Sequence, residues 1–226
     1  MMILFLILAQ VLIWLLIRYF AKKKFVWNGI LLICSAILLA VWMSYFGGSE
    51  FININILFLS CAIPLSYVLY LISLFIVGTK FTTENLIPFK RFIAKGKLFK
   101  TFRQNSIRNI FSSIYEELLY RWFLQNALYM LTNSTWISVT VTVIVFWAVH
   151  IRKGIAIVQM IDIFTFSLVI TFLFYFTVNP IYCIIIHIVR NQLVICQKYV
   201  TYQNQYERKT KYLKILQNIK AQQNGQ

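Results

Sequence analysis

Two adjacent acidic residues, Glu116 and Glu117, lie inside an apolar stretch, 110–131, that is long enough to cross a membrane. The chain has only six acidic residues in total. A charged side chain at the centre of a membrane costs about 2.5–3.5 kcal/mol on insertion scales, so it usually pairs with another charge or faces a polar cavity. Arg121 follows Glu117 by four residues, a spacing that places the two on one helix face, where they can pair. Glu116 is rotated by about 100° from Glu117, so the two carboxylates can take different roles.

Both histidines of the chain also lie in apolar stretches. His187 and Asn191 are four residues apart, and so are Phe146 and His150. At this spacing, each pair shares one face of its helix. Together with the Glu116–Glu117 segment, three helices therefore offer polar groups at one-turn spacing, which indicates a shared site.

Two further ionisable residues, Asp162 and Arg190, lie in apolar stretches outside these patterns. The preferred interpretation is an ion pair between two helices. A catalytic role is the less favoured alternative.

The composition is that of a membrane protein. Sixty per cent of the residues are hydrophobic, 17% are aromatic and 12% are charged, whereas a soluble domain has about a quarter charged residues. The net charge of +16 does not indicate nucleic-acid binding, because the basic residues fall in short segments between apolar stretches. Basic residues in such segments report membrane topology.

We therefore expect an all-α fold, a polytopic bundle of about seven transmembrane helices, each of which needs about 20 apolar residues. All but two of the 22 basic residues fall on one side of this arrangement, so the N-terminus is expected outside and the C-terminus in the cytoplasm. The expected spans are 2–20, 25–46, 54–78, 110–131, 137–151, 155–176 and 181–198.

The segments flanking the spans suggest further features. The basic segment 79–109 is expected to include an interfacial helix on anionic lipid, with substrate docking as the less favoured alternative. Residues 199–220 show helical spacing of apolar residues, which indicates a cytoplasmic amphipathic extension. The first span shows no signal-peptide cleavage pattern and is expected to be retained. The four cysteines lie in apolar stretches without metal-ligand spacing and are expected to be buried rather than paired or metal-bound, namely Cys34, Cys61, Cys183 and Cys196.

Three short patterns occur in the order and rough separation seen in one protein family. They are Glu-Glu-x-x-x-Arg at 116–121, Phe-x-x-x-His at 146–150 and His-x-x-x-Asn at 187–191. Residues 110–195 thereby resemble the CAAX-protease and bacteriocin-processing family of intramembrane peptidases, often labelled CPBP or Abi. The first three expected spans match nothing specific.

The resemblance implies roles for individual residues. Glu116 would be the base that activates water, and His150 would position and polarise that water. His187 and Asn191 would stabilise the oxyanion of the tetrahedral intermediate. Glu117 and Arg121 would orient the site, with Phe146 as a supporting residue. No metal is expected, and zinc held by Glu116, His150 and His187 is the minority alternative.

The function expected from the resemblance is glutamate-dependent hydrolysis of a peptide bond in a small membrane-associated or lipid-modified peptide. Bacteriocin self-immunity and peptide-pheromone processing are candidate processes. One alternative is a non-catalytic bacteriocin immunity protein that binds its target. A proton-coupled transporter is the second alternative, but the chain lacks the inverted repeat and broken helix pairs typical of carriers.

The expected organisation has three parts: residues 1–109, which hold the first three spans and the basic loop; residues 110–198, the catalytic core; and residues 199–226, the basic tail. The expected location is a plasma membrane. The abundance of Ile, Phe, Lys and Asn is typical of an AT-rich bacterial genome.

By the same span boundaries, His150 lies at the cytoplasmic mouth, whereas His187 lies near the outer end of its helix. The two histidines are then expected to differ in depth by about 10 Å, at 1.5 Å per helical residue. That separation is difficult to reconcile with one shared site.

Overall fold

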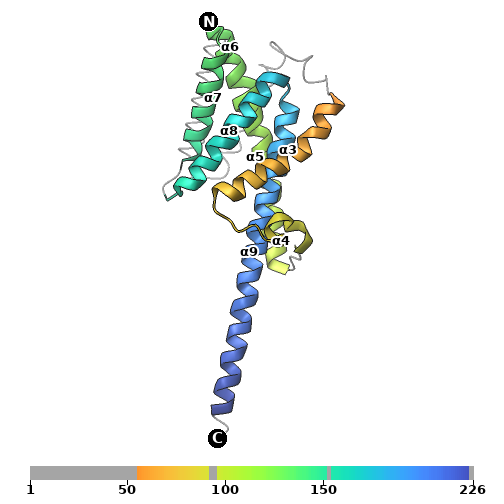
Figure 1. Ribbon diagram of the computed structural model, residues 1–226, viewed down its shortest axis with the longest axis vertical. Coiled ribbons are helices and arrows are strands. Elements are labelled where there is room, and N and C mark those ends of the chain that lie inside the picture. Colours follow the sequence, from red (N-terminus) through yellow and green to blue (C-terminus); the bar gives the residue numbers. More distant parts are fainter. Residues whose placement is uncertain (1–54, 92–95, 152–153, 224–226) are drawn as a thin grey trace, which may run out of the picture.

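The protein is a helical bundle in the computed structural model, which describes residues 55–91, 96–151 and 154–223 (Figure 1). Side chains are described in these ranges except for residues 90, 91, 96–98 and 207–223. In this part of the chain every regular element is a helix. In chain order the elements are α3 (Ile56–Ile76), α4 (Thr83–Leu86), the 3₁₀-helix η2 (Pro88–Arg91), α5 (Gly96–Glu117), the π-helix η3 (Leu118–Gln125), α6 (Asn126–Thr132), α7 (Thr135–His150), α8 (Ile157–Thr177) and α9 (Pro180–Gln223).

Helix α3 begins where the Asn55 side chain accepts a hydrogen bond from the Leu57 backbone N–H, as an N-cap does. Its buried residues recur at three- and four-residue spacing from Ala62 to Leu74, so one face packs inward, largely against α9. The short α4 is tied back to α3 by the Tyr70 hydroxyl, which donates to the Asn85 carbonyl.

Helices α5, η3 and α6 run without a break from Gly96 to Thr132. The helix that contains the expected span 110–131 therefore begins at Gly96, before the span itself. Residues 97–109 contain no glycine or proline and are rich in Lys, Arg, Gln, Leu and Phe, which favour helix or tolerate it. The first half of α5 packs against α9, where Asn105 donates to the Tyr199 hydroxyl and Ser106 donates to Gln192. Contact of the 79–109 segment with lipid stays a prediction.

A π-helix of eight residues begins directly after Glu117. Such segments are rare and often occur at functional sites, because the wider turn changes which side chains point inward. Here five consecutive residues of η3, Leu119 to Phe123, are all buried.

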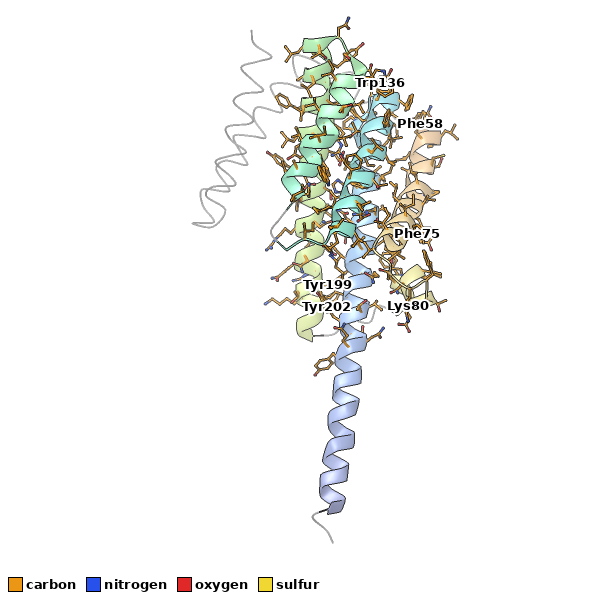
Figure 2. The ribbon with its side chains drawn as sticks, turned by 60° about the vertical axis from the view of Figure 1, so that its left-hand side comes forward. Phe58, Phe75, Lys80, Trp136, Tyr199 and Tyr202 are labelled. Carbon is orange, nitrogen blue, oxygen red and sulfur yellow. The ribbon has the colours of Figure 1, made fainter. Side chains whose placement is uncertain are left out.

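Helix α7 begins at the N-cap Ser134, whose side chain accepts a hydrogen bond from the Ile137 N–H. Helix α8 ends at Thr177, its C-cap Val178 takes the left-handed conformation with φ 51°, and Pro180 then opens α9. The expected seventh span and the expected helical tail form one helix of 44 residues. Its C-terminal half projects from the bundle (Figures 1 and 2).

Three described helices are long and apolar enough to cross a membrane: α3, α8 and the first part of α9, Pro180–Tyr206. Helix α7 is apolar but shorter. Exposed aromatic side chains lie near both ends of the bundle, with Trp136 at one end and Tyr202 at the other (Figure 2), as is typical of the two membrane interfaces. The expected spans 2–20 and 25–46 lie outside the described residues, so the number of spans and their orientation stay predictions.

The core of the bundle is made mainly of large apolar side chains from η3, α7, α8 and α9, among them Trp122, Phe146, Phe166, Phe174 and Ile186. Three cysteines lie in the described part, and all are unpaired. Cys183 and Cys196 are buried, as expected, but Cys61 is exposed on α3. The predicted burial is therefore wrong for Cys61.

Candidate active site

Glu116 is the penultimate residue of α5, two residues before the π-helix begins. One carboxylate oxygen, Oε1, accepts a hydrogen bond of 2.7 Å from the Ser112 hydroxyl one turn earlier. The other oxygen, Oε2, lies 3.5 Å from His150 Nε2 and 3.9 Å from His187 Nε2. The Glu116 side chain is 21% exposed. Glu116 thus has one oxygen held in place and one that both histidine rings approach.

The contact of His150 with the backbone fixes how its ring can act. Its Nδ1 lies 2.7 Å from the Phe146 carbonyl oxygen, which can only accept, so Nδ1 carries the hydrogen. In the neutral ring, Nε2 then has a lone pair, and this atom faces Glu116. The rings of Phe146 and His150 lie 4.4 Å apart, which further limits the orientation of the imidazole.

The Nδ1 atom of His187 is hydrogen-bonded to the second carboxylate, that of Glu117. This atom donates to Glu117 Oε1 at 2.6 Å, and Glu117 is completely buried. Arg121 NH1 donates to the same oxygen at 3.3 Å, so the ion pair expected from the four-residue spacing is present. The Arg121 guanidinium lies 4.1 Å from the centre of the Phe146 ring. Glu117 therefore contacts both Arg121 and His187 and fixes the orientation of the His187 ring.

The two histidines meet at one carboxylate, so the expected separation of about 10 Å in depth is wrong. The reason is the length of the helices: α7 has 16 residues, whereas α8 has 21. At 1.5 Å per residue, α7 is about 24 Å long, shorter than the hydrocarbon core of about 30 Å. His150 at its C-terminal end thereby reaches the same carboxylate oxygen as His187.

Asn191 lies one turn beyond His187 on α9, but its side chain is oriented by other residues. Its Oδ1 accepts a hydrogen bond of 2.9 Å from Arg190 NH1, and its Nδ2 lies 3.5 Å from the Ser113 hydroxyl. Because Arg190 occupies the oxygen, the amide nitrogen points toward α5, the helix that carries Glu116. Of the four residues predicted as catalytic, the structure brings Glu116, His150 and His187 together, and it places Asn191 beside them rather than in contact with Glu116.

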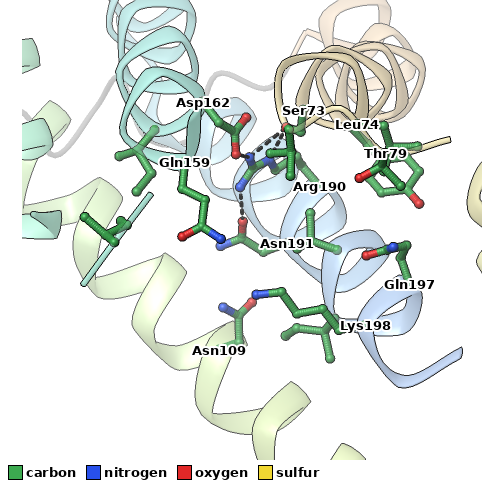
Figure 3. A pocket seen from close by; sticks show the side chains of 16 residues that line it. Ser73, Leu74, Thr79, Asn109, Gln159, Asp162, Arg190, Asn191, Gln197 and Lys198 are labelled. Atoms are coloured by element: carbon green, nitrogen blue, oxygen red, sulfur yellow. Dashed lines mark hydrogen bonds and ion pairs between the residues drawn. The ribbon is translucent and has the colours of Figure 1, made fainter. Parts of the chain in front are cut away.

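Arg190 is the centre of a second polar cluster, which links three helices (Figure 3). Its NH2 group donates to Asp162 Oδ2 of α8 at 2.5 Å and to the Ser73 hydroxyl of α3 at 2.7 Å. The ion pair expected between Asp162 and Arg190 is thus present. The guanidinium also lies 4.9 Å from the centre of the Phe166 ring, and that ring centre lies 4.9 Å from the centre of the His187 ring. The Arg190 cluster is therefore in contact with the candidate site.

A pocket of about 360 Å³ opens beside Asn191 (Figure 3). Four side-chain amides from three helices line it: Asn109 of α5, Gln159 of α8, and Asn191 and Gln197 of α9. Arg190 and Lys198 contribute positive charge, and Asp162 contributes a carboxylate. Amides both donate and accept hydrogen bonds, so this pocket suits a ligand with alternating donors and acceptors, as a peptide backbone has.

The minority alternative of a zinc site finds no support in the arrangement of ligands. Among the residues that the structure describes, no group of three or more His, Cys, Asp or Glu side chains could hold a metal ion.

Several residues of the site were missed in the sequence. Ser112 and Ser113 contact Glu116 and Asn191, and Ser73 contacts Arg190. Their only signal is a hydroxyl within or beside an apolar helix, which is too common to single out. Ser112 could have been found from its position four residues before Glu116.

Residues 105–193 match the family model described as type II CAAX prenyl endopeptidase Rce1-like. The chain carries an Rce1-like domain. The match contains all three sequence patterns and the residues that meet at Glu116, and the family consists of peptide-bond hydrolases. Together with the apolar helices, the match implies an intramembrane endopeptidase. No curated protein and no solved structure matches the chain.

The Rce1-like match begins within α5 and ends within α9, so it leaves out α3 and the projecting part of α9. Ser73 of α3 nevertheless contacts Arg190, which lies inside the match. A residue from outside the Rce1-like domain thus helps to build the surroundings of the candidate site.

Proposed function

We propose that the chain is a glutamate-dependent intramembrane endopeptidase. In this proposal it hydrolyses a peptide bond in a small membrane-associated or lipid-modified peptide without a metal. The observation that carries the proposal is the position of Glu116 Oε2, which both histidine Nε2 atoms approach at 3.5 and 3.9 Å.

The tautomers define what can bind between these groups. Neutral His150 presents a lone pair at Nε2, because its Nδ1 donates to the Phe146 carbonyl. Glu116 presents a carboxylate oxygen. A water molecule can donate one hydrogen to each of them, and its own oxygen lone pair is then available to attack a substrate carbonyl. Glu116 is the proton acceptor in this proposal, because its Oε2 is the carboxylate oxygen that both histidine rings approach.

The reaction follows from this arrangement. The water oxygen forms a bond to the carbonyl carbon while its proton moves to Glu116, and the carbonyl oxygen becomes an oxyanion. Asn191 Nδ2 donates to this oxyanion, and His187 donates from Nε2 when it is an imidazolium, whose charge Glu117 balances. Glu116 then transfers the proton to the peptide nitrogen as the C–N bond breaks. An amine and a carboxylic acid leave.

The pocket beside Asn191 supports a peptide as the substrate. Its four amides can pair with the N–H and C=O groups of an extended chain, which are costly to leave unpaired at membrane depth. The pocket also lies next to the amide proposed to stabilise the oxyanion, so a bound chain would lead to the reacting carbonyl.

The proposed activity is tested with the purified full-length chain in liposomes. The probe is a fluorescence-quenched peptide with an S-farnesyl cysteine near its C-terminus, and the same peptide without the farnesyl group is compared. Cleavage of either peptide, with fragments assigned by mass spectrometry and lost in the Glu116→Gln variant, supports the proposal. If neither probe is cleaved and a membrane peptidome is also left intact, the non-catalytic binding function takes its place.

Chelation tests the metal-free part of the proposal. We expect the cleavage rate to stay within about twofold of the untreated enzyme after incubation with excess 1,10-phenanthroline and dialysis, because the base acts on water directly. Metal content is measured on the same sample. A rate that falls after treatment and returns on addition of Zn²⁺ would contradict the prediction.

Replacement of Asp162 tests the orientation of Asn191. In Asp162→Asn, Arg190 loses its counter-ion and no longer holds the Asn191 oxygen firmly, so the amide can turn its oxygen toward the oxyanion. We expect kcat to fall about tenfold with little change in KM, a fraction of the loss seen when an oxyanion donor is removed outright. Steady-state kinetics on the cleaved probe measure both constants.

A double-mutant cycle separates this positioning role from a purely structural one. In the Asn191→Ala background, Asp162→Asn should cause little further loss, because the group that it positions is gone. Asp162→Glu, which keeps the charge, should recover part of the rate. Equal losses in both backgrounds would show that Asp162 does not act through Asn191.

A further inference from the structure

A line of buried polar side chains crosses the apolar interior, starting at Glu117 and leading away from Glu116. Three helices contribute to it at four-residue spacing, so each places its polar groups on one face. We call this line the polar seam: Glu117, Arg121 and Gln125 from α5 and η3, Ser167 and Thr171 from α8, and Thr142 and Ser138 from α7. All seven are buried, and none is more than 3% exposed.

The seam is arranged in successive levels, one helical turn apart. At the first level beyond Glu117, Arg121 NH2 donates to the Ser167 hydroxyl at 3.4 Å. At the next level, Gln125 Nε2 donates to the Thr171 carbonyl at 3.2 Å. Helix α7 runs in the opposite direction beside them, with Phe146 against Arg121 and Ser138 near Gln125. The polar side chains of α5, η3 and α8 thus follow one another along the seam, and α7 packs against one side of it.

The polar seam contains more hydrogen-bonding capacity than the protein satisfies. Five of its buried atoms have no partner among the residues that the structure describes: Glu117 Oε2, Arg121 Nε, Gln125 Oε1, Thr142 Oγ1 and Thr171 Oγ1. A buried polar atom without a partner costs about 1–3 kcal/mol, and more when the group is charged. Such a cost, repeated five times along one line, requires partners that are small and can both donate and accept.

A cavity of about 210 Å³ lies at the far end of the seam. Gln125 and Ser138 line it together with Asn126, Tyr129 and Tyr175. Gln125 is 3% exposed, and its Oε1 has no partner. The cavity lies near the start of α7 and the end of α8, the end of the bundle opposite to the projecting half of α9. It is large enough for several water molecules, since each needs about 10–15 Å³ of such space.

We propose that the polar seam binds a file of water molecules, which enters at this cavity and extends to the buried Arg121–Glu117 pair. Water is the only common ligand small enough to reach five separate atoms in a packed helix interface and to satisfy both donors and acceptors. The file hydrates the ion pair behind His187 from the end of the bundle opposite to the substrate pocket. The proposal concerns water binding, and it stands whether or not Glu116 is the catalytic base.

The opposing hypothesis is a dry seam, in which the polar groups serve only to hold the helices together. Interhelical polar contacts in membranes average about 0.6 kcal/mol, less than the cost of one unpaired buried atom. The two hypotheses differ in one measurable property: a thiol placed in the seam meets water in the first case and apolar side chains in the second.

Cysteine labelling tests the proposal, because a thiolate, the reactive form, forms only where water or charge stabilises it. Thr142→Cys and Ser138→Cys place a thiol of similar size in the seam. Val143→Cys and Val139→Cys are matched controls, since these neighbours are equally buried but point to other faces. The full-length protein in liposomes is treated with methyl methanethiosulfonate, and the modified peptides are quantified over time by mass spectrometry. Native Cys183, which is completely buried, is the reference in every sample.

We expect both seam cysteines to react at least about tenfold faster than their controls while Cys183 stays unmodified. Equal, slow reaction of seam and control positions would overturn the proposal. So would a fast reaction at residue 138 alone, because the cavity would then be wet and the seam dry. If a variant shows modification of Cys183, its fold is disturbed, and Thr171→Cys against Ile170→Cys decides in its place. Peptide cleavage is not part of this measurement, so failure of the proposed peptidase activity cannot be mistaken for failure of the water file.

Discussion

Glu116→Gln is expected to lower kcat for peptide cleavage by about two to four orders of magnitude, the usual contribution of a general base. The substitution keeps the shape of the side chain, and the amide oxygen can still accept the hydrogen bond from Ser112. It removes the group that accepts the proton from water between Glu116 and His150. Because the substrate pocket is formed by other side chains, KM should change little. Initial rates of cleavage of the quenched peptide in liposomes measure both constants.

Glu84→Gln is the matched control for this experiment. Glu84 is another acidic residue of the described part, on the short helix α4, where it accepts a hydrogen bond from Asn204. It lies on α4 and not on a helix that carries Glu116, His150 or His187, so its replacement should leave kcat unchanged. If Glu116→Gln inserts, accumulates and cleaves at the parental rate, Glu116 is not the base, and the reading of the site as a peptidase centre is wrong.

The separation of residues in the sequence was sufficient to predict the main pairs of the site. Glu117 with Arg121 follows from four-residue spacing within one helix, which depends only on local geometry. The meeting of Glu116, His150 and His187 does not follow from local geometry, because it joins three helices. It was predicted from the order of three motifs, and the Rce1-like match contains all three.

The depth of the histidines could not be predicted, because it depends on where helices end in space. The sequence placed His150 at the membrane surface, since Arg152 follows it closely. The short α7 instead brings His150 to the carboxylate that also faces His187. The start of α5 at Gly96 was missed for a related reason: hydropathy detects the apolar part of a helix but not its polar continuation.

The polar contacts between helices were the least predictable part. Asp162 and Arg190 could be paired because both are costly to bury alone. The bond from Arg190 to Ser73, 117 residues away in the chain, and the bond to Asn191 depend on how α3, α8 and α9 pack. The polar seam is of the same kind. Serine and threonine are tolerated in apolar helices because they can bond to their own backbone, so their presence alone does not reveal a shared line.

Replacement of the neighbouring carboxylate, Glu117, is expected to lower the stability of the protein, whereas replacement of Glu116 is expected to lower kcat. Glu117→Gln leaves the charge of Arg121 buried without a counter-ion, and both side chains are completely buried. Removal of one partner from a buried ion pair typically costs about 3–5 kcal/mol of stability. We therefore expect Glu117→Gln to lower the free energy of unfolding in mixed detergent micelles by this amount. Titration with sodium dodecyl sulfate, followed by tryptophan fluorescence, measures it.

Two further variants show whether the loss comes from the unpaired charge. Glu116→Gln should change the unfolding free energy by less than about 1 kcal/mol, because Glu116 is partly exposed and its partners are not obligate ions. Glu117→Gln combined with Arg121→Met removes both charges and keeps the volume of the side chains, so most of the stability should return. A Glu117→Gln protein as stable as the parent would show that Arg121 is neutralised by another group. A double variant no better than the single one would show that the hydrogen bond from His187 to Glu117, rather than the Arg121 charge, sets the cost. In either case, the proposed division of roles, in which Glu116 reacts and Glu117 balances the buried charge of Arg121, would be wrong.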